Sequence, residues 1–205
     1  MLTRLIVLFF LLVCFSANAQ EEEPKPPPKI GNQVFLPSLE IGYLFNSASV
    51  LSGSVLIKSS IELRLRNNND LFLRVNYDKY DADYTLEPEN NLTNVIKGTA
   101  AFTDLLLGPG YRFGDKKYRM FIMVQGGFKY YNFPEFVQNN NVVNLEQGRS
   151  RTFTSRATLG LEYYLTEKSA ISLDFIQGQV WDKKDFWADS GSALGFSIGF
   201  ITSLY

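Results

Sequence analysis

The sequence predicts an all-β protein, namely an eight-stranded antiparallel up-and-down transmembrane β-barrel. Two observations carry this prediction: strand-like runs in which apolar and polar residues alternate, and connections that alternate between short and long. The segment 61–78, IELRLRNNNDLFLRVNYD, shows the alternation, because charged or polar residues occupy every second position on both sides of NNND. Alternation of this kind indicates strands with two unlike faces.

Residues 1–19 have the features of a secretory signal peptide. Arg4 supplies the positive start, residues 5–15 form an unbroken apolar run, and Ala17-Asn18-Ala19 is a small-x-small cleavage site. The run is shorter than the roughly 20 residues that a transmembrane helix needs. Lipidation at Cys14 is the alternative, but the residue before this cysteine is not small. Cleavage after Ala19 leaves a mature chain without cysteine.

Residues 20–37 are predicted to be a periplasmic tether, and residues 38–205 the barrel domain. The stretch QEEEPKPPPKIGNQ cannot pack a core, so we expect an extended, semi-rigid linker. A proline-rich signalling ligand is the alternative interpretation. Within the barrel domain, the eight predicted strands span residues 38–46, 55–66, 71–82, 99–113, 118–132, 152–165, 169–181 and 192–204.

The connections between these strands differ in length in a regular way. Tight polar turns are predicted at 67–70, 114–117 and 166–168, longer loops at 83–98, 133–151 and 182–191, and a connection of intermediate length at 47–54. With eight antiparallel strands, all the tight turns and both termini fall at one end. This asymmetry is typical of outer-membrane barrels, which have short periplasmic turns and longer external loops.

The orientation of the two faces separates a membrane barrel from a secreted lipocalin-like ligand-binding barrel. Alternation fits both, because the two differ only in which face is inside. Strands longer than ten residues, aromatic residues at both ends of the apolar runs, and glycines on the charged face favour the membrane barrel. The two aromatic belts are expected at Tyr111, Phe113, Tyr118 and Tyr163 near the tight turns, and at Tyr43, Phe45, Tyr77, Tyr130, Phe153 and Trp181 near the longer loops.

The charged face is therefore expected to fill the lumen with ion pairs. An eight-stranded barrel has an interior just wide enough for side chains, so the lumen is predicted to be largely closed. The predicted network contains the six anions Glu40, Glu62, Asp78, Asp104, Glu162 and Asp174 and the eight cations Lys58, Arg64, Arg66, Arg74, Arg112, Arg119, Lys129 and Arg156.

The composition excludes several classes of function. The chain has 0 His, and cleavage removes its only cysteine, which eliminates Ser-His, Cys-His and histidine-based metal chemistry. We expect no enzyme activity and no catalytic, cofactor or metal site. A paired-carboxylate hydrolase is the remaining enzymatic alternative, but carboxylates beside arginines stay ionised. The net charge of −1 gives no electrostatic footprint for nucleic acid.

The chain resembles the small outer-membrane barrels of the OmpA/OmpX type, the OmpW-like proteins and the "outer membrane protein beta-barrel domain" group. The resemblance covers residues 38–205 and rests on the signal peptide, the alternating strands, the asymmetric loops and the last strand, ALGFSIGFITSLY. Such proteins end in an aromatic residue that the barrel-assembly machinery reads. Tyr205 is a similar C-terminal aromatic residue. The apolar residues of this strand, however, occupy the same alternate positions as Leu204, so they lie on the face opposite to that of Tyr205. The tether and the Asn-rich loops are also similar to Bacteroidota envelope proteins.

This resemblance implies a location in the bacterial outer membrane, contact with outer-membrane lipids and lipopolysaccharide, and assembly by the barrel-assembly machinery. Together with the absence of histidine, it implies a porin-like, non-enzymatic protein that acts as a structural or surface-interaction protein through its extracellular loops. An envelope protein that binds the loops or the tether is an expected partner. A narrow OmpW-like channel for small hydrophobic compounds is the alternative.

Overall fold

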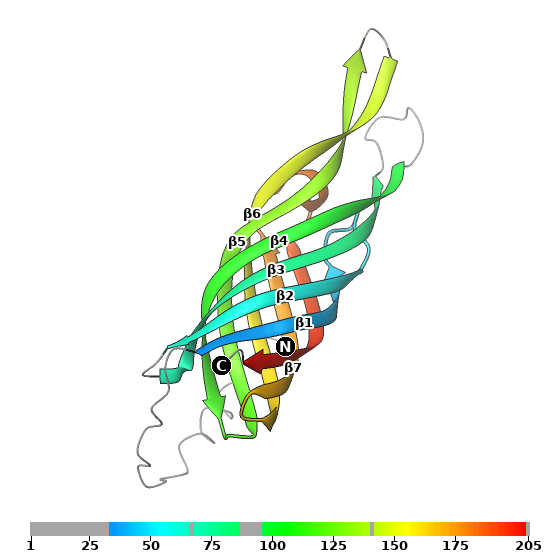
Figure 1. Cartoon of the computed structure of the whole chain (residues 1–205). Coiled ribbons are helices and arrows are strands. Elements are labelled where there is room, and N and C mark those ends of the chain that lie inside the picture. The colour runs from blue at the N-terminus through cyan, green and yellow to red at the C-terminus, as the bar shows by residue number, and fades with distance from the viewer. Residues whose placement is uncertain (1–32, 66–67, 87–95, 140–141, 204–205) are drawn as a thin grey trace, which may run out of the picture. The chain divides into compact units, whose positions relative to one another are not determined.

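The computed structural model describes residues 33–65, 68–86, 96–139 and 142–203 (Figure 1). The predicted signal peptide, most of the predicted tether and Tyr205 lie outside these residues. Within the described part of the chain, no helix is long and apolar enough to cross a membrane.

Eight antiparallel strands form one closed barrel, so the predicted fold class is confirmed (Figure 1). Each strand pairs with the next along the chain, and the last pairs with the first. The strands are β1 (Gln33–Asn46), β2 (Ser54–Leu65), β3 (Asn68–Leu86), β4 (Ile96–Gly114), β5 (Tyr118–Asn139), β6 (Val142–Thr166), β7 (Ser169–Val180) and β8 (Ser192–Ser203), with a short 3₁₀ helix, η1 (Asp185–Trp187), between β7 and β8.

The first strand begins at Gln33 rather than at residue 38, so it takes in the end of the predicted tether. Val34 is paired with Leu63 of β2, and Phe35 with Ser203 of β8. Pro37 has no N–H to donate, and the register against β8 shifts directly after it. The proline therefore produces an irregularity within the strand, whereas the sequence analysis places it in the tether.

The hairpin of β5 and β6 also extends further than predicted. Its strands pair without interruption to Asn139 and Val142, where the sequence analysis expects a loop over residues 133–151. Pairing between β4 and β5 reaches only Tyr131, and pairing between β6 and β7 reaches only Thr154. The rest of the hairpin therefore forms a two-stranded ribbon beyond the barrel wall, visible at the top of Figure 1.

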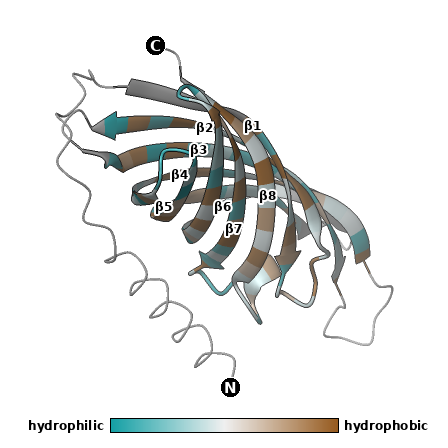
Figure 2. Cartoon of the chain, turned by 90° about the horizontal axis from the view of Figure 1, so that it is seen from below, coloured by the Kyte–Doolittle hydropathy of each residue, from teal (hydrophilic) through white to brown (hydrophobic). Residues whose placement is uncertain are grey.

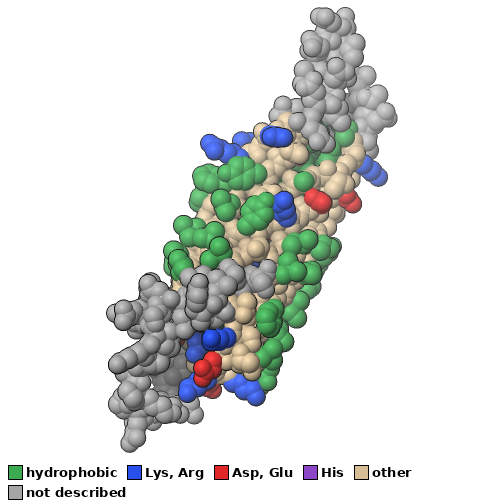
Figure 3. Space-filling model, in the orientation of Figure 1, with side chains coloured by type: hydrophobic (Ala, Val, Ile, Leu, Met, Phe, Trp, Pro, Cys, Tyr) green, Lys and Arg blue, Asp and Glu red, His purple; other side chains and the backbone are tan. Residues whose placement is uncertain are grey.

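The two faces of the barrel are oriented as the membrane interpretation predicts. Leu73, Ile122 and Phe200 are 40%, 41% and 43% exposed, whereas Arg74 and Glu162 are 0% and 2% exposed. Exposed large apolar side chains occur on all eight strands. Hydropathy alternates along the strands in Figure 2, and apolar side chains spread over the wall in Figure 3. A water-soluble ligand-binding barrel would have the reverse arrangement.

Glycines on the inner face let the strands and side chains approach closely. A Cβ atom at Gly160 would lie 2.0 Å from the ring of Phe121, and one at Gly108 would lie 2.0 Å from the carbonyl oxygen of Val124. Pairing between β4 and β5 is interrupted beside Gly108, at Pro109, which cannot donate to the ladder. The inner glycines thus make room for the large charged and aromatic side chains described next.

Candidate functional site

The barrel interior contains a balanced set of buried charges. Arg66 lies outside the described residues, and Arg119 is only half-buried. The Arg119 Nε atom donates to the carbonyl oxygen of Asp115 at 3.3 Å, and no ion pair of the described residues includes this side chain. Among the described residues, the buried charged side chains are six cations (Lys58, Arg64, Arg74, Arg112, Lys129 and Arg156) and six anions (Glu40, Glu62, Asp78, Asp104, Glu162 and Asp174).

Glu62 is the centre of a first cluster, towards the tight-turn end of the barrel. Its carboxylate accepts from Arg64 Nε at 2.7 Å, from Arg74 Nη2 at 2.6 Å and from Arg112 Nη2 at 3.0 Å. The strand register explains one of these contacts, since Glu62 on β2 lies opposite Arg74 on β3. Charge-assisted bonds of this kind are stronger than neutral ones.

Two aromatic rings support the guanidinium groups of this cluster. The Arg112 Cζ atom lies 4.5 Å from the ring centre of Phe72, and the Arg74 Cζ atom lies 4.7 Å from that of Phe121. Arg112 also donates through Nε and Nη2 to the two oxygens of Glu162, at 2.8 and 2.7 Å. The rings and carboxylates fix both guanidinium planes, which a planar, delocalised cation permits.

Lys58 forms a second cluster in the middle of the barrel. Its ammonium group donates to Glu40, to Asp174 at 2.8 Å and to the hydroxyl of Ser197 at 3.1 Å. On the two neighbouring strands, Lys58 lies opposite Glu40 and Asp78. One buried cation is thereby surrounded by acceptors from several strands, which is the arrangement that a buried ammonium group requires.

A third cluster pairs two cations with two anions towards the long-loop end. Asp78, Asp104 and Lys129 face one another across β3, β4 and β5. Arg156 donates to Asp78 and, at 3.1 Å, to Asp104, so it bridges two neighbouring like charges. Lys129 donates to Asp104 at 2.7 Å and to the hydroxyl of Tyr80.

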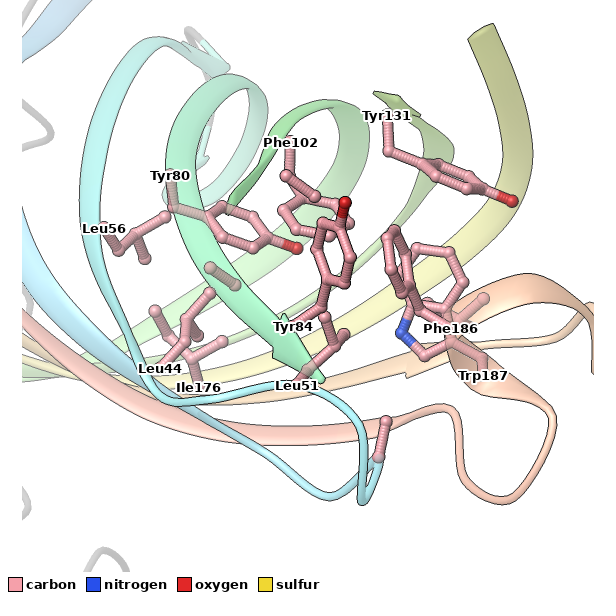
Figure 4. Close-up of a cluster of buried hydrophobic side chains, with 14 residues drawn as sticks. Leu44, Leu51, Leu56, Tyr80, Tyr84, Phe102, Tyr131, Ile176, Phe186 and Trp187 are labelled. Carbon is pink, nitrogen blue, oxygen red and sulfur yellow. The ribbon is translucent and has the colours of Figure 1, made fainter. Parts of the chain in front are cut away.

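An aromatic cluster lies beyond these charges, at the long-loop end of the interior (Figure 4). Phe186 and Trp187 of η1 are 0% and 4% exposed. The Trp187 ring lies 4.7 Å from the ring of Tyr131, and the Phe186 ring lies 5.3 Å from that of Tyr84 and 5.8 Å from that of Phe102. We call these five side chains the aromatic plug. The sequence predicts only a loop over residues 182–191, although the apolar pair in DFWAD is a signal for burial.

Hydrogen bonds hold the loop that carries η1 against strand β5 and against the connection between β1 and β2. The hydroxyl of Tyr131 donates to Asp185 Oδ2 at 2.6 Å, and the backbone N–H of Ser49 donates to Asp189 Oδ2 at 2.8 Å. The bond from Ser49 lowers the pKa of Asp189 from its usual range. Asp185 has a φ of 53°, a left-handed conformation that Asp tolerates better than most residues.

A recess beside the aromatic plug reaches the third ion-pair cluster. Its lining includes Trp187 of the plug, Tyr80, Lys129 and Arg156 of the interior, and Gln179 near the end of β7. In the described part of the chain, no group of His, Cys, Asp and Glu side chains is arranged to hold a metal ion.

Several solved structures are similar to the chain. Neisserial surface protein A is 11% identical, with a TM-score of 0.53 over 84% of this chain and 97% of that one. The Yersinia pestis attachment invasion locus protein Ail is 11% identical (TM-score 0.47; 84% and 97% covered), and the N-terminal β-barrel domain of Pseudomonas aeruginosa OprF is 18% identical (TM-score 0.43; 83% and 97% covered). No protein-family model and no curated protein sequence matches the chain. At these identities the likeness shows the fold alone, which is that of small outer-membrane β-barrels.

Proposed function

We propose that this chain, which has the fold of a small outer-membrane barrel, is a non-enzymatic membrane protein with an interior closed to solutes. One observation carries the proposal: three ion-pair clusters and the aromatic plug follow one another along the interior. A closed interior leaves the lipid-facing wall and the two ends as the surfaces available for interaction. We infer a structural or surface-interaction role through the long-loop end.

The outer wall supports a location in the bacterial outer membrane. Large apolar side chains are exposed on every strand, whereas soluble monomers rarely expose a contiguous apolar patch larger than a few hundred Å². Lipid tails are the occupant that such a closed apolar band fits. On this proposal the chain contacts outer-membrane lipids and lipopolysaccharide, and the barrel-assembly machinery inserts it.

The chemistry of the interior supports a role without catalysis. The chain contains 0 His, and all six buried carboxylates form ion pairs with buried cations. A paired-carboxylate hydrolase needs one carboxyl group kept protonated, in reach of both substrate and water. Of these carboxylates, Asp104 lines the recess beside the aromatic plug, where it accepts from Lys129 and Arg156. A carboxylate that is paired with two cations does not provide that arrangement.

The long-loop end supports interaction with another envelope component. The β5–β6 ribbon continues beyond the barrel wall, and among the strands that the structure describes no third one pairs with its backbone. A ribbon of this kind presents two free strand edges, which are surfaces that partner chains use.

Reconstitution of the full mature chain tests this proposal. We expect the protein to fractionate with outer membranes, to migrate differently on gels before and after heating, and to give no steady conductance in planar bilayers. Steady ion currents would contradict the closed interior. Recovery as a soluble periplasmic protein would contradict the membrane location, and hydrolysis of lipid or peptide by the reconstituted protein would contradict the non-enzymatic role.

A further inference from the structure

Four outward-facing side chains form a continuous polar row on neighbouring strands near the long-loop end. The register pairs Lys79 of β3 with Thr103 of β4, Thr103 with Tyr130 of β5, and Tyr130 with Arg151 of β6. We call these four residues the basic row. Lys79, Tyr130 and Arg151 are exposed, and Thr103 is half-buried.

The basic row lies directly beside the edge of the apolar wall. The adjacent outward row, one step closer to the tight turns, is formed by Tyr77, Leu105, Phe128 and Phe153, which are paired with one another in the same order. The Lys79 Nζ atom lies 5.5 Å from the ring centre of Tyr77, and the Arg151 Cζ atom lies 5.7 Å from that of Phe128. Both cations therefore lie against aromatic rings at the edge of the apolar wall, which is the position of the lipid headgroups in a membrane.

Within the described strands, the exposed cations at this end lie on one side of the barrel, on β3 to β6. The connection after β7 carries the exposed Lys183 and Lys184, and Lys184 forms an ion pair with Asp182 at 3.0 Å. At the same end of the remaining strands, the outward positions are uncharged: Gln177 on β7, Leu194 on β8, Phe45 on β1 and Val55 on β2. Arg149 lies further along β6 and adds a third exposed cation on this side. Asp81 is one outward position beyond Lys79 and is the nearest opposing charge along β3. An uneven distribution of this kind indicates a local site rather than a general polar rim.

We propose that the basic row binds the headgroup of an outer-leaflet lipid that carries two phosphate groups, with its acyl chains against the apolar row. This inference rests on the proposed membrane location. Lys79 and Arg151 are three strand spacings apart, about 14 Å, so each cation meets a separate phosphate. Arg151 offers the planar fork that suits a phosphate, and Lys79 acts as a point charge. Thr103 and Tyr130 supply hydroxyl donors between the two.

The test uses the full mature chain in phosphatidylcholine vesicles that contain a small fraction of diphosphorylated lipid A. Binding of the lipid A is measured for the wild-type protein, for Lys79→Gln/Arg151→Gln, and for Lys117→Gln. Lys117 is the matched control, because it also rests on a tyrosine, 5.5 Å from the ring centre of Tyr163, but at the tight-turn end. Dephosphorylated lipid A and phosphatidylglycerol are the comparison lipids.

We expect the double variant to bind diphosphorylated lipid A about thirtyfold more weakly than the wild type, since each interfacial cation contributes about five- to sixfold. The Lys117 variant is expected to bind as the wild type does. Equal binding by wild type and double variant, equal binding of the dephosphorylated lipid, or an equal preference for phosphatidylglycerol would overturn the basic row as a site for two phosphates. Heat-dependent gel migration of each sample reports insertion separately, so a failure of the membrane location is distinguishable from a failure of this site.

Discussion

Replacement of Glu62 by glutamine is the most direct test of how the interior is held together. Glu62 accepts from three buried guanidinium groups, those of Arg64, Arg74 and Arg112. The substitution preserves the volume of the side chain but leaves the six buried cations with five anions. It also turns an NH₂ donor towards groups that can only donate.

The expected cost follows from the burial of these partners. Glu62, Arg74 and Arg112 are each 0% exposed, so water cannot replace the lost charge. Removal of one partner of a buried pair typically destabilises a protein by about 3–5 kcal/mol. Glu162 retains its contacts with Arg112, whereas the nearest remaining anion to Arg74 is Asp174, at 3.9 Å. We expect Glu62→Gln to lower the free energy of unfolding by an amount in that range.

Urea unfolding in lipid vesicles measures this change, with tryptophan fluorescence and gel migration as readouts. The control is Asp83→Asn, because Asp83 is exposed and accepts from Thr99 Oγ1 at 2.7 Å. Its expected effect is within about 0.5 kcal/mol. The Glu62→Gln/Arg74→Gln double variant should lose less than the sum of the single variants, since it restores the charge balance. A change below about 1 kcal/mol for Glu62→Gln would refute the view that this cluster stabilises the barrel.

Three further outcomes are expected. Gly127→Ala should prevent heat-stable barrel formation, because its Cβ would lie 2.0 Å from a backbone oxygen of β4, whereas Gly126→Ala, with its nearest contact at 3.4 Å, should fold; refolding yield in vesicles compares the two. Phe186→Ala should destabilise the protein by about 3–5 kcal/mol and increase bilayer conductance, and unchanged currents would show that the ion pairs alone close the interior. The pKa of Asp189 is lower in the folded protein than in the unfolded chain, so the bond from Ser49 stabilises the loop fully at a pH above the unfolded-chain pKa of this carboxyl group. This stabilisation is lost as the pH falls through the folded-state pKa. A pH titration of tryptophan fluorescence should show this transition, and Asp189→Asn should abolish it.

The sequence was sufficient to predict the barrel because alternation is a property of each strand alone. Alternation alone does not say which face is inside, so that prediction also depends on strand length, on the aromatic residues at the strand ends and on the inner glycines. Most of the described charged residues that it places inside are buried in the structure. Arg119 is the exception among the described residues. It has the parity of the inner face, but its position beside the tight turn at Asp115 leaves it half-exposed. Whether a residue occupies an even or odd position in a strand determines the face on which it lies. Its burial also depends on how far it lies from the end of the barrel.

The aromatic plug and the long ribbon could not be predicted in this way. Phe186 and Trp187 lie in a connection without any period, and their burial depends on Tyr84, Phe102 and Tyr131 from three strands. Contacts between distant segments leave no pattern within either segment. The β5–β6 ribbon differs from the prediction because local signals point the wrong way. Its proline and asparagines are strong signals for a loop, but the continuous pairing of β5 with β6 overrides them.

The balanced charges also specify the register of the barrel. Apolar side chains could fill the same interior, and buried ion pairs are weak evidence for net stability. A slip of one residue in any strand, however, turns its inner face to the outside. On the proposed membrane location, a slip of β3 would expose Arg74 and Asp78 to lipid and turn Leu73 into the charged interior. An arginine at the bilayer midplane costs about 2–4 kcal/mol in a barrel of this kind, and the pairs left inside would lose their partners. The charged interior therefore makes every neighbouring register expensive, which an apolar interior beneath an apolar wall could not do.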